Sequence, residues 1–138
     1  MADNYIIIGR TQTTDSPGGD KVRDVVRVTV QTKPSGVVFE FNQPLGAALN
    51  ASIAARAHTY SDEIESIVAS PEVGAVSYVQ DINPADNIVD YLRVWVVASN
   101  DNGEADGYFN QPFSNLDAAE VGVKVVNLYK ALLATLNL

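Results

Sequence analysis

Phe41-Asn42-Gln43-Pro44 recurs as Phe109-Asn110-Gln111-Pro112, 68 positions later in a chain of 138 residues. The residues before the two copies also correspond, because Val26-Arg27-Val28-Thr29-Val30 precedes the first and Leu92-Arg93-Val94-Trp95-Val96 precedes the second. Self-similarity at a fixed interval is the signature of repeated structural units. The sequence therefore predicts a tandem duplication.

The apolar residues that follow the two tetrapeptides repeat at the same interval. In each copy the spacing is four, three, four and four residues: Ile53, Ala57, Tyr60, Ile64 and Val68 in the first, and Val121, Val125, Leu128, Leu132 and Leu136 in the second. Such spacing is typical of the buried stripe of a helix. Pro44 and Pro112 are expected to open the two helices. The second helix is predicted over about 115–137, whereas the polar stretch 58–62 leaves the continuity of the first open.

Before each helix the sequence predicts three strands. Short β-branched runs at 4–10 and 75–80 begin the two halves, with a breaker cluster at 13–20 after the first. Longer alternating runs follow at 22–32 and 88–98, and third strands are expected at 37–41 and around 107–110.

This βββα-βββα order predicts an α+β fold. We expect a tandem duplication of a βββα unit, with an antiparallel sheet or sheets, two long helices packed on one face, and pseudo-twofold symmetry. Its length suits one domain, residues 1–138, built of two similar halves at about 1–70 and 71–138.

Composition and charge exclude several classes of protein. Hydrophobic residues make up 46% of the chain, which is enough to bury a core, but no run reaches the roughly 18 apolar residues of a membrane span. Nine basic residues, mostly scattered, stand against seventeen acidic ones, so we expect no nucleic-acid partner and no membrane attachment. The N-terminus has no basic segment before its apolar run, so no signal peptide is expected. These features predict a soluble protein, located in the cytoplasm or in a virion.

The residue types needed for common catalytic and metal sites are scarce. The chain has no cysteine and one histidine, His58, so no catalytic residues, metal site or cofactor are predicted. The repeated residues remain weak binding candidates: Arg27, Arg93, Asn42, Gln43, Asn110 and Gln111. Their amides would either form a shared site on the axis or satisfy backbone groups where strand and helix meet. The two arginines would either bind a ligand or lie exposed on alternating strands.

We therefore expect a non-enzymatic structural or assembly protein that acts through protein–protein surfaces. Its partners would be other copies, as a homo-oligomer, or a larger scaffold. In its acidity, small size and lack of cysteine the chain is similar in overall character to virion components, such as coat or decoration proteins of bacterial viruses. The alternative is a small-molecule-binding domain or small enzyme with a site in the pseudo-twofold cleft, where Arg27 and Arg93 would be tested first.

Overall fold

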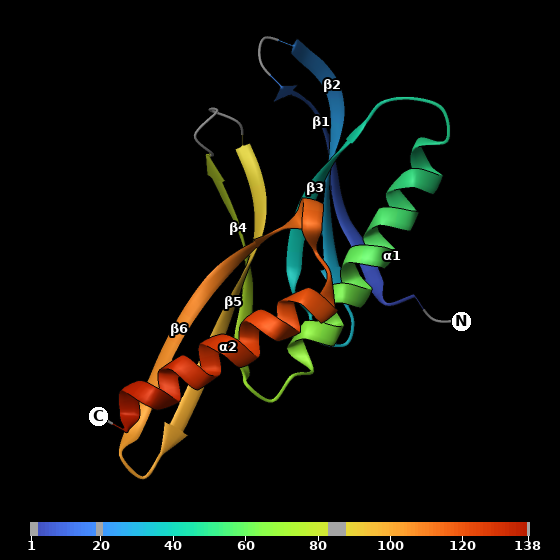
Figure 1. Cartoon of the computed structure of the whole chain (residues 1–138). Coiled ribbons are helices and arrows are strands. Elements are labelled where there is room, and N and C mark those ends of the chain that lie inside the picture. Colours follow the sequence, from blue (N-terminus) through green and yellow to red (C-terminus); the bar gives the residue numbers. More distant parts are fainter. Residues whose placement is uncertain (1–2, 19–20, 83–87, 138) are drawn as a thin grey trace.

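The structure, a computed structural model, describes residues 3–18, 21–82 and 88–137. Three strands and a helix are followed by three further strands and a second helix (Figure 1). The first half contains β1 (Tyr5–Gly18), β2 (Lys21–Thr32), β3 (Val38–Pro44) and α1 (Leu49–Val68). The second contains β4 (Val73–Ile82), β5 (Ile88–Asn100), β6 (Gly103–Pro112), a 3-10 turn (Phe113–Asn115) and α2 (Ala118–Leu136). The expected α+β fold is confirmed.

Each half forms its own antiparallel three-stranded sheet, in the order β1-β2-β3 and β4-β5-β6. The central strands alternate as expected for a sheet with one buried face. Val28 and Val30 of β2 are fully buried, and so are Leu92, Val94 and Val96 of β5. The residues between them point to the opposite face, which we call the outer face of each sheet.

The two sheets repeat the same local geometry. β1 has an irregularity between Ile7 and Gly9, and β4 has one between Val73 and Ala75, 66 positions later. An extra residue at such a bulge bends a strand and increases its twist. Both hairpins are therefore bent at corresponding places.

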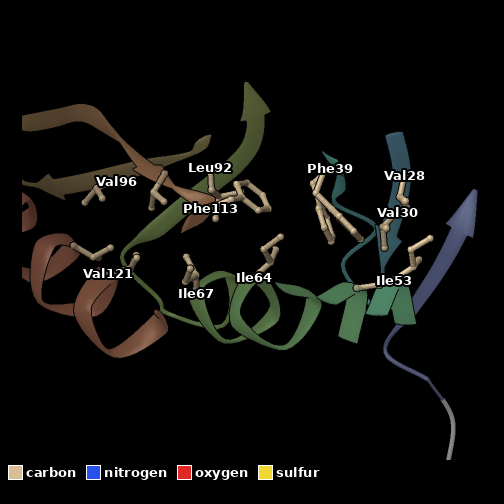
Figure 2. Close-up of a cluster of buried hydrophobic side chains, with 14 of the residues drawn as sticks. Val28, Val30, Phe39, Ile53, Ile64, Ile67, Leu92, Val96, Phe113 and Val121 are labelled. Atoms are coloured by element: carbon tan, nitrogen blue, oxygen red, sulfur yellow. The ribbon is translucent and has the colours of Figure 1, made fainter. Parts of the chain in front are cut away.

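Both helices lie on one side of a common core, and the strands lie on the other side (Figure 2). The predicted helical stripes are confirmed, because their members are buried or pack against this core: Ile53, Ala57, Tyr60, Ile64 and Val68 in α1, and Val121, Val125, Leu128, Leu132 and Leu136 in α2. α1 is continuous through 58–62, because the stripe crosses that polar stretch. Within the described residues, no helix has the length and apolar character needed to cross a membrane.

Two boundaries differ from the expectation. Pro44 and Pro112 end strands instead of opening helices, and each is paired at the end of an edge strand, where a missing N–H is tolerated. α2 begins after Asp117, whose side chain accepts a hydrogen bond from the N–H of Ala119 and caps the helix.

The first hairpin is longer than expected. β1 continues through the predicted breaker cluster to Gly18, because pairing with β2 extends as far as Gly18 and Lys21. Residues 19 and 20 of that cluster lie outside the described residues. β3 pairs only with Val25–Gln31, so the end of the hairpin projects beyond the sheet (Figure 1).

A glycine replaces a large side chain at one corresponding position of the two halves. Phe39 on β3 is buried, and its ring centroid lies 5.9 Å from that of Tyr60 on α1. Gly107 holds the corresponding place on β6, where an added Cβ would lie 3.4 Å from Leu128 and 3.7 Å from Leu132 of α2. Leucines from α2 therefore fill the space that Phe39 fills in the first half.

Candidate functional site

Arg27 of β2 lies where the two halves meet. Its guanidinium forms an ion pair with Asp90 of β5, at 3.0 Å from Nη2 to Oδ1 and 3.3 Å from Nη1 to Oδ2, and both side chains are mostly buried. Nη1 also donates to Oδ1 of Asn42 at 3.0 Å, and Nη2 donates to the hydroxyl of Tyr78. Glu40 adds a second carboxylate, 3.6 Å away. The first half therefore supplies a cation that the second half neutralises.

The partners of Arg27 from the second half come from one end of the β4-β5 hairpin. Tyr78 donates its hydroxyl proton to Asp90 Oδ1 at 2.5 Å, and Gln80 donates to the same oxygen at 3.1 Å. Burial would lower the pKa of Arg27, but the hydrogen bond and charge of Asp90 outweigh it and raise the pKa. Burial, followed by the hydrogen bond to Asp90 and its negative charge, strongly raises the pKa of Tyr78. Arg27 therefore keeps its positive charge and Tyr78 keeps its phenol proton at neutral pH.

Tyr78 is expected to make the protein less stable at alkaline pH. The unfolded chain releases this proton near its ordinary pKa of 10.0, whereas the folded protein retains it because its pKa is raised. Below pH 10 the folded and unfolded states both hold this proton, so the stabilisation by Tyr78 is fully present. Above pH 10 the free energy of unfolding falls by up to about 1.4 kcal/mol per pH unit. Urea unfolding from about pH 8 to pH 11 measures this slope.

The Tyr78→Phe variant is expected to flatten that slope. Tyr108→Phe is the matched control, because Tyr108 is exposed and lies outside the cluster. An alkaline slope that is equally steep in Tyr78→Phe and in the unmodified protein would contradict the prediction.

Arg93 of β5 repeats the setting of Arg27 without the carboxylate. Its Nε donates to Oδ1 of Asn110 at 3.0 Å, and β5-β6 pairing sets these two residues opposite each other as β2-β3 pairing does for Arg27 and Asn42. Its guanidinium lies 4.4 Å from the ring centroid of Tyr108, which contacts Trp95 at 4.6 Å. Within the described part of the chain, Arg93 forms no ion pair.

The glutamines of the tetrapeptides bind to the helices that follow them. Gln43 Oε1 accepts a hydrogen bond from Arg56 of α1 at 2.9 Å, and Gln111 Oε1 accepts one from Lys124 of α2 at 2.7 Å. Gln111 also donates to the backbone carbonyl of Asn115 at 2.7 Å. These bonds give the amides intramolecular partners at both strand-to-helix connections.

The six candidate residues fall into two groups instead of one shared site. Arg27 bonds to Asn42, and Arg93 bonds to Asn110. Gln43 and Gln111 bond instead to Arg56 and Lys124 of the helices, and none of these bonds joins the two halves. Each group is built around one arginine–asparagine pair on the outer face of a sheet. In the first of these pairs the guanidinium also binds a carboxylate, that of Asp90.

Sequence reasoning missed the partners that complete these groups. Arg56 and Lys124 are 68 positions apart, the interval of the tetrapeptides, so this signal was available. Asp90 was not predicted as the partner of Arg27, since 63 residues separate the two. The available signal was that an aspartate precedes each arginine by three residues, Asp24 before Arg27 and Asp90 before Arg93.

No protein-family model, curated protein or solved structure matches this chain. The geometry of the two arginine groups is therefore the basis for a functional proposal. Among the described residues, no three His, Cys, Asp or Glu side chains gather as ligands for a metal ion.

Proposed function

We propose that this chain is a non-enzymatic assembly protein that acts through protein–protein surfaces. The observation that carries the proposal is that Arg27 and Arg93 differ in their partners. Arg27 on the outer face of the first sheet is neutralised by Asp90, whereas Arg93 on the outer face of the second sheet pairs with no carboxylate of the described residues. A surface of this kind suits a protein partner that brings its own carboxylate.

Exposed apolar side chains support the same proposal. They occur on several elements of the chain: Ile6, Ile8, Val22, Val38, Leu45, Tyr108, Val123 and Val126. Ile6, Ile8 and Val22 lie on the β1-β2 hairpin, and Val22 lies on its projecting end. The free edge of β1 also offers backbone groups to a partner. Other copies of the chain or a larger scaffold are the proposed partners, and the cytoplasm or a virion is the proposed location. A coat or decoration protein of a bacterial virus is the specific role we propose.

The proposal includes the tandem duplication. The shared sheet order, the bulges 66 positions apart and the two arginine–asparagine pairs all support it. In place of a pseudo-twofold axis, we favour a head-to-tail relation between the halves. A twofold axis would form an Asp24–Arg93 pair together with the Asp90–Arg27 pair, and only the second pair is present among the described residues.

Static light scattering over a concentration series tests the assembly role. We expect the mass to rise from that of the 14.8 kDa chain to discrete oligomers or growing assemblies as concentration increases. A constant monomer mass up to about millimolar concentration would overturn self-assembly. Thermal stabilisation of such a monomer by a metabolite would instead favour the ligand-binding alternative.

A further inference from the structure

The geometry points to a specific contact between copies, and this inference rests on the assembly role proposed above. We define the first arm as residues 14–18 and 21–24, the part of the β1-β2 hairpin beyond β3. We propose that the first arm of one copy packs on the outer face of the β4-β5-β6 sheet of a second copy. In that contact Asp24 pairs with Arg93, as Asp90 pairs with Arg27 inside the chain.

The receiving surface is already arranged for a carboxylate. Arg93 donates to Asn110 Oδ1 at 3.0 Å through Nε, and Arg27 donates to Asn42 Oδ1 at the same distance through Nη1. Beside it Tyr108 is 49% exposed, and Trp95 lies against Tyr108. A preorganised guanidinium next to an exposed aromatic ring is typical of the centre of a protein interface.

The first arm carries the matching group. Asp24 faces Thr14 across the β1-β2 pair, and Asp90 faces Gln80 across the β4-β5 pair, with both residues shifted by 66 positions. Asp24 is exposed and forms no ion pair within the described residues. Asp24 therefore holds the same position in the β1-β2 pair as Asp90 holds in the β4-β5 pair, and from that position Asp90 reaches Arg27.

Apolar residues near Asp24 would be covered by the same contact. Val22 is 67% exposed on the first arm. Leu45, whose backbone N–H donates to the carbonyl of Asp24, is 43% exposed, while Phe113, 68 positions later, is 5% exposed in the contact between halves. Covering such side chains would add apolar burial to the ion pair.

The proposed contact joins two different surfaces, the first arm and the outer face of the β4-β5-β6 sheet, and every copy carries both. A head-to-tail contact of this type leaves a free arm at one end and a free sheet at the other, and it produces rings or open filaments. Neighbouring copies would thus pack against each other in the same way as the two halves pack within one copy.

Charge reversal at each surface tests the pairing. In Asp24→Arg and in Arg93→Glu, like charges would meet in every self-contact, and we expect self-association about 100-fold weaker than in the unmodified chain. Asp101→Arg and Lys130→Glu make the same charge changes at exposed positions in the β5-β6 turn and on α2, outside the Asp24–Arg93 pairing, and are expected to assemble normally. Far-UV circular dichroism checks that all four variants fold.

Mixing the two weakened variants gives the sharper result. The arginine introduced on the arm of the Asp24→Arg variant would meet the glutamate introduced on the sheet of the Arg93→Glu variant. The unchanged Asp24 of the second variant would meet the unchanged Arg93 of the first, so both contacts in an alternating assembly are complementary. We expect the equimolar mixture to regain the mass of the unmodified assembly in light scattering. Two variants that stay monomeric when mixed would overturn the pairing.

Trp95 reports on the same surface without any substitution. It is the one tryptophan of the chain and lies on the proposed receiving face, so assembly should shift its emission to shorter wavelength. Assembly that leaves this emission and the two variants unaffected would overturn the proposed contact while the assembly role stands. A chain that stays monomeric throughout would overturn both the proposed contact and self-assembly.

Discussion

Replacing Phe113 with alanine is expected to lower the free energy of unfolding by about 4 kcal/mol, the cost typical of deleting a buried aromatic ring. Phe113 is 5% exposed, and its ring centroid lies 5.4 Å from Phe39, 5.2 Å from Tyr60 and 6.0 Å from Tyr78. Two of these rings belong to the first half and one to the second. The variant would therefore lose packing that holds the halves together, which urea unfolding measures directly.

Leu45→Ala is the matched control for Phe113→Ala. Leu45 precedes Phe113 by 68 positions but is 43% exposed, so its loss should cost less than about 1 kcal/mol in the monomer. Both measurements belong at low protein concentration, where association contributes little. Equal costs for the two variants would contradict the assignment of Phe113 to the contact between halves.

Replacing Asp90 with alanine is expected to cost about 3 kcal/mol, since it leaves a largely buried guanidinium without its main partner. Tyr78 and Gln80 would lose their acceptor in the same step. Glu40, 3.6 Å from Arg27, remains as a weaker partner, which keeps the expected cost at the lower end for a broken buried pair. Thermal or urea unfolding of the monomer measures the change.

Asp24→Ala removes the same charge from the corresponding place in the first half. Asp24 is exposed and unpaired within the described residues, so its loss should change the free energy of unfolding by about 0.5 kcal/mol or less. The comparison separates the ion pair from the general effect of net charge. If both variants were equally destabilised, the Asp90–Arg27 pair would not be what stabilises the contact between halves.

The element order and the helical stripes were predictable because both depend on periodicity that the chain itself carries. Ile53 and Val121 could be assigned to the core from spacing alone, and the structure buries both. The residues at which the helices begin could not be predicted from Pro44 and Pro112. Proline also fits the end of an edge strand, and pairing with β2 and β5 decides between these two roles.

The extent of the first arm and the partner of Arg27 could not be predicted from the sequence for a different reason. Polar residues at 13–18 indicate a loop by composition, yet pairing with β2 extends the strand to Gly18. The partner of Arg27 depends on how two sheets pack, and no local pattern encodes that arrangement. Repetition within the chain was the remaining signal, because Asp24 and Asp90 stand at the same spacing before Arg27 and Arg93.

The difference between Phe39 and Gly107 gives the two halves different shapes where strand and helix meet. In the first half Phe39 of β3 fills the space between strand and helix. In the second half Leu128 and Leu132 of α2 fill the corresponding space. Placing α1 over the second sheet would set Tyr60 and Ile64 above a bare glycine, and placing α2 over the first would crowd two leucines against a phenyl ring. Each sheet is therefore complementary in shape to its own helix, and this complementarity specifies which helix covers which sheet.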